Sequence, residues 1–265
     1  MQKLSNIEAA AIERFALSVT VPILQEVGDS ASLRATGTLF KIDGRAFLIT
    51  ARHVFDDVDP TALAYPENPL RGGLHTFGHF NILKPTEESV DVAAIELQDT
   101  ETVRRFDANW QYLSLENVAT ASTNTSDGSC FVSGYPASLT RNDQGWTKGK
   151  FMTVYTQRIP DIPPEAELPV TADLDLFYDY GSEGMSVTGE TVRTPELPGV
   201  SGASVWELAS SAPSVWSADA VTRVVGIQSA FMHSKYIRAT SWWAIAKVLE
   251  QKDEQLAVAV RAKLS

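Results

Sequence analysis

The first residues follow a helical pattern. Apolar residues recur at helical spacing from Leu4 to Phe15, and Ser5 and Glu8 stand at the two positions of a capping box. We therefore expect a short amphipathic helix that packs on the body of the protein.

After this helix the pattern changes to short apolar runs of strand length, most of them bounded by Gly, Asp, Asn or Pro. The runs cover residues 17–24, 37–42, 46–50, 90–97, 130–132, 151–155, 204–208 and 221–227. Strands separated by turns, without interleaved helices, predict a sandwich or barrel and not a doubly wound sheet. Helical spacing returns after Ser241, which predicts a C-terminal helix.

The polar, irregular segment 98–128 is typical of a linker between two β halves. Its most linker-like part is 119–127, which consists of small and polar residues. A second unusual segment, 161–198, holds nine acidic residues against a single arginine, so it carries −8 of the net charge of −11. Its prolines favour extended loops. The simplest interpretation is a solvated loop, although negative charge near a cleft would also attract basic substrates.

Composition narrows the choice of partners. The chain has 265 residues, 44% of them hydrophobic, which is enough for a buried core without disulfides or metals. We expect no nucleic-acid partner, because the chain has a net negative charge and lacks a Lys/Arg cluster that could neutralise phosphates. No apolar run of about 18 residues is present, and Glu8 and Glu13 interrupt the N-terminal pattern, so we expect neither a membrane segment nor a signal peptide.

The cysteine and histidine content suggests a protein without bound metal. A solitary Cys130 favours a reducing, cytoplasmic location, with a secreted bacterial protein that lacks disulfides as the alternative. His75, His79 and His233 lack cysteine or nearby carboxylate partners, which argues against zinc. We expect no cofactor.

Three separated segments contain the residue types of nucleophilic acyl transfer. His53 follows one apolar run, Asp91 begins another, and Ser201 lies between Gly199 and Gly202. A serine hydroxyl needs a base to take its proton, and an imidazole does this best when a carboxylate accepts its other N–H. Glycines on both sides of a serine allow successive backbone N–H groups to point at one oxyanion.

The sequence leaves some alternatives open at this point. Asp56, Asp57 and Asp99 are near enough in the chain to replace Asp91 as the carboxylate. An acyl hydrolase of the α/β-hydrolase fold would require the order Ser, Asp, His and a Gly-x-Ser-x-Gly elbow, which the chain does not have.

The order His, Asp, Ser resembles that of the chymotrypsin-like (trypsin-like) serine peptidases, and most closely that of their bacterial, disulfide-free branch. The motifs that carry the resemblance are Thr50-Ala-Arg-His53, Asp91-Val-Ala-Ala-Ile95, Val132-Ser-Gly-Tyr-Pro136, Gly199-Val-Ser-Gly-Ala203 and Val224-Val-Gly-Ile227. The resemblance implies an all-β fold of two antiparallel six-stranded β-barrels. Residues 1–24 would form the N-terminal helix and a lead-in strand, 25–118 the first barrel, 119–240 the second barrel, and 241–265 the C-terminal helix.

The resemblance also implies roles for individual residues. Ser201 would be the nucleophile, His53 the general base and then acid, and Asp91 the group that orients the imidazole, with an oxyanion hole formed by the backbone N–H groups of Gly199 and Ser201. The substrate-binding wall would contain Ser229, Ala230, Phe231 and Pro195.

The implied function is a serine endopeptidase that acts on protein or peptide substrates, with a regulatory protein partner as a further expectation. The alternative is a weak or inactive pseudo-peptidase that serves as a protein-binding module.

Several positions depart from the family pattern. Val200 stands where the secreted digestive enzymes have the aspartate that captures a new N-terminal amine, so we expect activity without such cleavage. Ala203 replaces a glycine and Ser204 a proline. Phe231 stands where a glycine often leaves the pocket open, which would favour small or medium apolar side chains.

Overall fold

The computed structural model describes residues 4–27, 30–70, 72–120, 129–143, 146–186, 190–209 and 215–264. The predicted N-terminal helix is α1 (Asn6–Val19), and its capping box forms as expected. The Ser5 hydroxyl accepts from the N–H of Glu8, and the Glu8 carboxylate accepts from the N–H of Ser5 at 2.7 Å. The helix continues to Val19, so the strand predicted at 17–24 begins only at Thr20.

The first β half is an antiparallel sheet of seven strands in the order β5-β4-β1-β2-β3-β7-β6. Its strands are β1 (Thr20–Val27), β2 (Ser30–Ile42), β3 (Arg45–Thr50), β4 (Leu63–Pro66), β5 (Leu74–Thr76), β6 (Phe80–Leu83) and β7 (Ala93–Leu97). This half therefore has seven strands where six were expected. β1 pairs along its length with β2, so it belongs to this sheet, and the expected boundary after residue 24 falls inside a strand.

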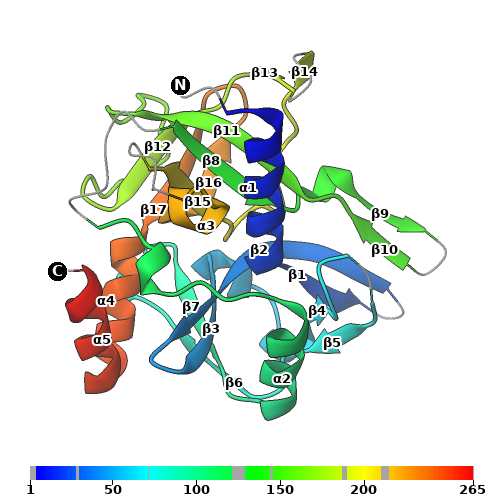
Figure 1. The fold of residues 1–265 in the computed structure, drawn as a ribbon, viewed down its shortest axis with the longest axis vertical. Helices are drawn as coiled ribbons and strands as arrows, with labels where there is room; N and C mark the ends of the chain where they lie inside the picture. Colours follow the sequence, from blue (N-terminus) through cyan, green and yellow to red (C-terminus); the bar gives the residue numbers. More distant parts are fainter. Residues whose placement is uncertain are drawn as a thin grey trace.

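The second β half is a closed barrel of six strands in the order β11-β12-β17-β16-β15-β8. Its strands are β8 (Ser129–Gly134), β11 (Met152–Ile159), β12 (Asp175–Asp179), β15 (Ser204–Leu208), β16 (Thr222–Met232) and β17 (Tyr236–Ser241). Two hairpins extend from it: β9 (Thr140–Asp143) with β10 (Trp146–Gly149), and β13 (Glu183–Met185) with β14 (Thr191–Arg193). Figure 1 shows this barrel above the first sheet.

The solid apolar runs of the sequence are explained by strands that are buried on both faces. In β8, Cys130 and Val132 point into the barrel, whereas Phe131 between them points toward the other half of the molecule. One face of such a strand fills its own barrel and the other fills the interface between the halves, so the alternation of apolar and polar residues disappears.

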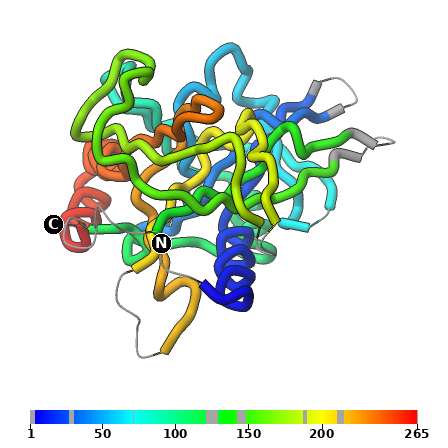
Figure 2. The backbone as a smooth tube through the Cα atoms, turned by 90° about the horizontal axis from the view of Figure 1, so that it is seen from above, coloured from blue at the N-terminus to red at the C-terminus, as the bar shows by residue number. Residues whose placement is uncertain are grey.

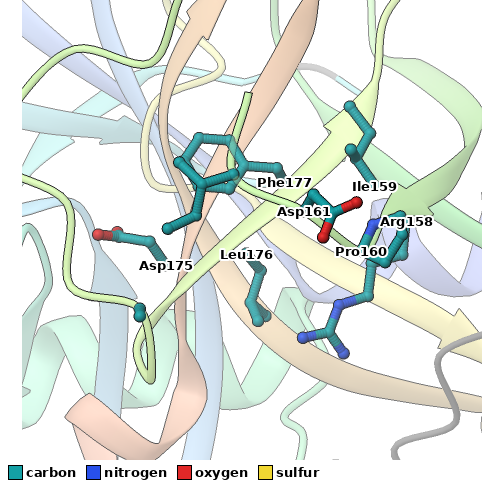
Figure 3. Close-up of a pocket in the computed structure, with 9 residues that line it drawn as sticks. Arg158, Ile159, Pro160, Asp161, Asp175, Leu176 and Phe177 are labelled. Atoms are coloured by element: carbon teal, nitrogen blue, oxygen red, sulfur yellow. The ribbon is translucent and has the colours of Figure 1, made fainter. Parts of the chain in front are cut away.

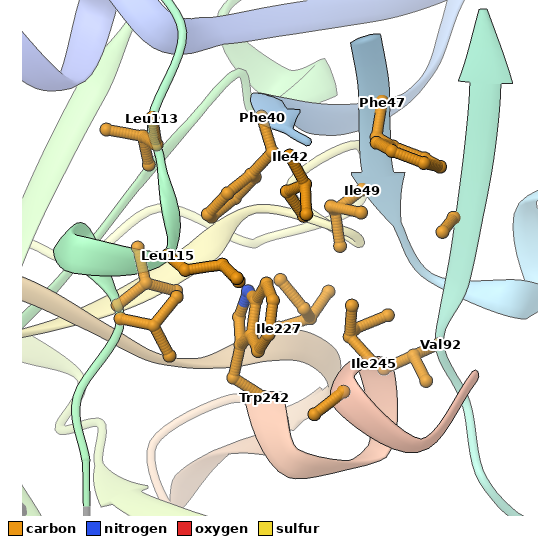
Figure 4. Close-up of a cluster of buried hydrophobic side chains, with 14 of the residues drawn as sticks. Phe40, Ile42, Phe47, Ile49, Val92, Leu113, Leu115, Ile227, Trp242 and Ile245 are labelled. Atoms are coloured by element: carbon orange, nitrogen blue, oxygen red, sulfur yellow. The ribbon is translucent and has the colours of Figure 1, made fainter. Parts of the chain in front are cut away.

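The interface between the halves is one continuous apolar cluster (Figure 4). Phe40 and Phe47 enter it from the first sheet, Ile227 from the barrel, and Trp242 and Ile245 from the C-terminal helix. α1 closes another side of this cluster, and Figure 1 shows it lying across both halves. The Phe15 ring of α1 packs edge-on against Trp206 of β15 with 5.9 Å between ring centroids.

Two helical regions differ from expectation. The segment expected to be irregular contains α2 (Thr100–Asn109), whose first turn is capped by the Asp99 carboxylate, which accepts from the N–H of Thr102 at 2.7 Å. Most of 119–127 lies outside the described residues. The C-terminal helix is divided at Asp253 into α4 (Trp242–Lys252) and α5 (Glu254–Leu264).

The remaining helical elements are short. They are η1 (Arg52–Phe55), η2 (Pro60–Ala62), η3 (Leu115–Asn117), η4 (Ala137–Leu139) and α3 (Ala218–Val221). Among the helices of the described residues, none has the length and apolar character needed to cross a membrane.

The described parts of the acidic segment 161–198 form the barrel strand β12, the strands β13 and β14, and connecting loops, drawn in yellow-green in Figure 2. Arg238 anchors its first part: the guanidinium donates to Asp175 Oδ1 at 3.0 Å and to the carbonyl of Glu167 at 3.0 Å. Lys235 pairs with Glu165 at 3.1 Å. Part of the negative charge is therefore neutralised within the barrel itself.

Candidate active site

His53 lies in η1, directly after β3 delivers the chain to the interface between the halves. Its Nδ1 is 2.7 Å from Asp91 Oδ2, and its backbone N–H donates to Asp91 Oδ1 at 2.9 Å. Both carboxylate oxygens thus hold one residue, which fixes the position of the backbone and the plane of the ring. With Nδ1–H donating to the carboxylate, the neutral imidazole carries its lone pair on Nε2.

The surroundings of His53 raise its pKa above the ordinary value. The hydrogen bond to Asp91 is the largest cause; partial burial opposes it, the negative charges of Asp91 and Asp56 add to it, and the positive charge of Arg34 reduces it. The imidazolium that forms when a base accepts a proton is therefore stabilised at this position.

The other carboxylates considered from the sequence have different surroundings. Asp99 accepts the cap hydrogen bond of α2, and Asp56 and Asp57 are exposed. Asp91 is the carboxylate that is hydrogen-bonded to His53.

Ser201 stands in a tight turn between Leu197 and Ala203. The N–H of Val200 donates to the carbonyl of Leu197 at 2.9 Å, and that of Ala203 to the carbonyl of Val200 at 2.8 Å. In the described part of the chain, the N–H groups of Gly199 and Ser201 donate to no backbone or side-chain acceptor. Two backbone N–H donors in one turn that have no acceptor among the described residues are what an oxyanion hole requires.

The serine turn packs directly against the strand that leads to His53. A Cβ on Gly202 would lie 2.0 Å from Thr50 Oγ1 and 2.8 Å from the nitrogen of Ala51. Gly202 also has φ +89°, a conformation that side chains rarely adopt. Glycine at this position therefore lets Ser201 approach the segment that carries the imidazole.

The Ser201 hydroxyl and the imidazole are not joined by a hydrogen bond. Within the described residues, the hydrogen bonds of the His53 ring go to Asp91 alone. In structures without substrate, bonds of this kind are often long and shorten when substrate binds.

Thr36 of β2, which no sequence motif indicated, joins the two halves at this point. Its hydroxyl donates to the carbonyl of Gly199 at 2.8 Å and accepts from the N–H of Tyr135 at 3.2 Å. Its own N–H donates to the carbonyl of Ser201 at 2.9 Å. Two bonds of Thr36 therefore orient peptide groups of the serine turn, and the third ties its hydroxyl to Tyr135 of the second half.

The residues expected to form the substrate-binding wall lie around the serine turn. Phe231 packs against the apolar cluster that contains Leu197 and Val200. Pro195 accepts a hydrogen bond at its carbonyl from the hydroxyl of Tyr180, a buried residue that the sequence analysis did not single out. Two aromatic rings thus occupy this wall.

Ser229 and Ala230 lie where β16 is irregular opposite β17. The hydroxyl of Ser229 donates to the carbonyl of Arg238 at 3.4 Å, and the carbonyl of Ala230 accepts from Gln228 Nε2 at 2.9 Å. Gln228 also accepts at its carbonyl from the N–H of Gly202 at 2.8 Å, so this part of β16 is tied to the serine turn.

The departures from the family pattern have structural counterparts. Val200 and Ala203 are fully buried among apolar side chains, and the hydroxyl of Ser204 is 2.9 Å from Thr38 Oγ1 across the interface. A charged aspartate at position 200 would be desolvated in these surroundings.

A surface pocket of about 330 Å³ lies elsewhere on the barrel, between the end of β11 and the start of β12 (Figure 3). Asp175 lies at one end of the view and Arg158 at the other. None of the expected site residues lines it. In the described ranges, no group of three or more His, Cys, Asp or Glu side chains is arranged to hold a metal ion.

Comparison with known proteins identifies the fold. The structure of an inactivated protease paralogue of the scabies mite is similar to this chain, with 13% identity and a TM-score of 0.55. The match covers 90% of this chain and 96% of the paralogue. The chymotrypsin-like two-barrel fold, with N- and C-terminal helices, is therefore confirmed.

Two structures from Sesbania mosaic virus are also similar. The serine protease domain of its polyprotein has 15% identity and a TM-score of 0.48, and covers 87% of this chain and 91% of its own. A structure from a study of the coupled folding and binding of the VPg protein has 16% identity and a TM-score of 0.47. The match covers 86% of this chain and 87% of that structure's chain. No family model and no curated protein matches the chain. These neighbours give no support to the expected bacterial branch.

Proposed function

We propose that the protein is a serine endopeptidase in which Ser201, His53 and Asp91 form the catalytic triad. The observation that carries this proposal is the two-point hydrogen bonding of His53 by Asp91, next to a glycine-flanked serine turn with two free N–H donors. An imidazole held in this way has its tautomer and orientation fixed, which a base must have.

In the proposed reaction, the Ser201 hydroxyl attacks the carbonyl carbon of a peptide bond while Nε2 of His53 takes its proton. The developing oxyanion accepts from the N–H groups of Gly199 and Ser201. The C–N bond then breaks, and the imidazolium returns the proton to the leaving amine. Water repeats the sequence on the acyl-enzyme, which releases the acid and restores Ser201.

We infer that the side chain before the cleaved bond is small or of medium size and apolar. Phe231 and Tyr180 place aromatic rings beside the serine turn, and Leu197 belongs to the same apolar cluster that Phe231 packs against. The finer assignments to a bacterial branch, a cytoplasmic location and a regulatory partner rest on the sequence alone.

Labelling by a fluorophosphonate probe tests this function. We expect the probe to label the protein and the label to be lost in Ser201→Ala but retained in Ser138→Ala, an exposed serine on η4. Cleavage of a peptide library by the wild type, lost in Ser201→Ala, would define the specificity. A folded wild type that neither takes the label nor cleaves any peptide contradicts the proposal and favours the binding module.

A further inference from the structure

One arginine of the first sheet stands out because its position in the strand is irregular. Ile23 of β1 faces Ala35 of β2, but the next residue, Leu24, faces Leu33. Arg34 is therefore the extra residue of a β-bulge. A bulge turns its extra residue away from the regular direction of the strand, and bulges of this kind are frequent next to active sites.

The bulge directs Arg34 to the turn that carries His53. Its Nε donates to the carbonyl of Val54 at 3.3 Å, and its Nη2 to the carbonyl of Asp56 at 2.7 Å. The half-buried guanidinium is thus held by two backbone carbonyls one and three residues after the imidazole. Two fixed bonds of this type position the remaining donors before any ligand arrives.

The guanidinium keeps binding capacity. Its Nη1 has no hydrogen-bond partner among the residues that the structure describes, and no carboxylate there lies within 4.0 Å of the group. A guanidinium offers five N–H donors in a planar arrangement that matches a carboxylate. Among the described residues, the guanidinium is therefore held by backbone carbonyls and not by a carboxylate.

The position of Arg34 relative to Ser201 and His53 determines which part of a bound substrate it can contact. Its neighbour Leu33 lies against the serine turn, since a Cβ on Gly199 would be 2.7 Å from Leu33 Cδ2. Residues 33 and 34 therefore lie beside the oxyanion donors and the imidazole. The amine that leaves takes its proton from that imidazole, so the departing chain begins next to Arg34.

A basic hairpin extends this side of the molecule. Arg141 of β9 and Lys148 of β10 face one another and are exposed, and β10 contacts β2. Figure 2 shows the end of β1, the start of β2 and the strands β9 and β10 on the same side of the molecule. Two cationic side chains therefore stand on this hairpin, beside β2.

We propose that Arg34 is a specificity-determining residue that binds a carboxylate on the departing side of the substrate, within the first two residues after the cleaved bond. This inference rests on the proposed function, whose nucleophile and base define that side. The carboxylate is either an Asp or Glu side chain or the free C-terminus of a short substrate.

Matched peptides test the inference through a ratio of rates. Pairs that differ by Glu or Gln at the first or second position after the cleaved bond, each as free acid and as C-terminal amide, separate the two sources of carboxylate. We expect wild-type kcat/KM to favour Glu by about tenfold or more, because a charge-assisted bond is lost with Gln. The Glu/Gln ratio should fall to about one in Arg34→Gln and below one in Arg34→Glu, because a carboxylate at position 34 repels the Glu side chain.

Two controls distinguish recognition from support of the His53 turn. Arg104→Gln, an exposed arginine on α2, should keep the wild-type ratio. A purely structural role of Arg34 would lower kcat/KM for Glu and Gln peptides equally, and an unchanged ratio in Arg34→Gln overturns this inference while the proposed function stands. A wild type that takes no fluorophosphonate label and cleaves no peptide overturns both.

Discussion

The hydroxyl of Thr36, in the first sheet, donates to the carbonyl of Gly199, in the second half of the molecule, at 2.8 Å. This bond holds the peptide group between Gly199 and Val200, and the N–H of Tyr135 fixes the Thr36 hydroxyl by donating to it. The N–H groups that would stabilise an oxyanion therefore depend on a residue of the other half. The geometry of the serine turn is set by the contact between the halves as much as by its own glycines.

Thr36→Val tests this dependence. Valine keeps the shape but leaves the Gly199 carbonyl and the Tyr135 N–H unpaired and buried, which should cost about 2 kcal/mol of unfolding free energy. We expect kcat to fall about tenfold with little change in KM, because the oxyanion donors matter most in the transition state. Steady-state kinetics and urea denaturation measure the two effects.

The matched control is Thr38→Val, which removes a hydroxyl bonded to Ser204 at 2.9 Å on the same strand and equally buried. This variant should lose stability to a similar extent without a specific loss of kcat. Equal kcat values for the two variants would contradict a positioning role of Thr36.

The acid limb of kcat/KM should lie above pH 6.5, because the base must be neutral and the bond to Asp91 raises the pKa of His53 above 6.5. Activity is then lost as the pH falls through this raised pKa. Asp91 and Asp56 favour the imidazolium, whereas Arg34 opposes it, so Arg34→Gln should move the limb to higher pH. A pH–rate profile in which the limb lies below 6.5 would contradict this assignment.

Asp91→Asn should reduce kcat by roughly 10³-fold or more, because the amide no longer fixes the tautomer of His53 or stabilises its charged form. The acid limb should also move to lower pH, since the bond and the charge that raise the pKa are lost. Asp107→Asn, which affects an exposed partner of Lys41, is the control and should behave as the wild type. Kinetics with one reference peptide over a range of pH measures both effects.

Gly202→Ala should destabilise the protein severely, by about 4 kcal/mol or more, because its methyl group would lie 2.0 Å from Thr50 Oγ1 and 2.2 Å from the carbonyl oxygen of Thr36. Gly44→Ala separates the clash from the backbone strain. Gly44 also has positive φ, +74°, but no atom lies within 4 Å of the added Cβ, so this variant should lose only about 1 kcal/mol. Chemical denaturation compares them, and equal losses would show that packing at Gly202 is unimportant.

The docking of the C-terminal helices depends on a charged group at Arg45. Its guanidinium bonds to Glu96, whose side chain is 9% exposed, and to Asp253 between α4 and α5. Arg45→Met would strip the nearly buried Glu96 of its closest partner and should cost about 3 kcal/mol. Asp253→Asn removes a more exposed charge and should cost below about 1 kcal/mol. Urea denaturation measures both, and the reverse order would contradict this account.

The sequence was most informative where chemistry and local pattern coincide. The capping box of Ser5 and Glu8 defines the start of α1, and the ends of apolar runs locate His53 and Asp91. These features depend on neighbours in the chain. Asp91 is hydrogen-bonded to His53, and the catalytic roles that the resemblance implies for both residues stay predictions.

Other features depend on contacts that no local pattern records. The bond from Thr36 to Gly199 spans 163 positions, and Arg34 acquires its direction from a bulge opposite β1. α2 was missed because its sequence is mostly polar, with Thr102 and Phe106 as its buried residues. Its start is defined by Asp99, which the sequence analysis treated as a possible catalytic carboxylate.

The apolar cluster between the halves has a consequence for how the protein folds. Neither half closes its own hydrophobic surface: Phe47 and Ile49 of one and Phe131, Trp206 and Ile227 of the other are buried by each other and by α1 and α4. A fragment with one barrel alone would present these side chains to water and aggregate. The intact chain should instead melt in a single calorimetric transition, with both halves unfolding at the same temperature.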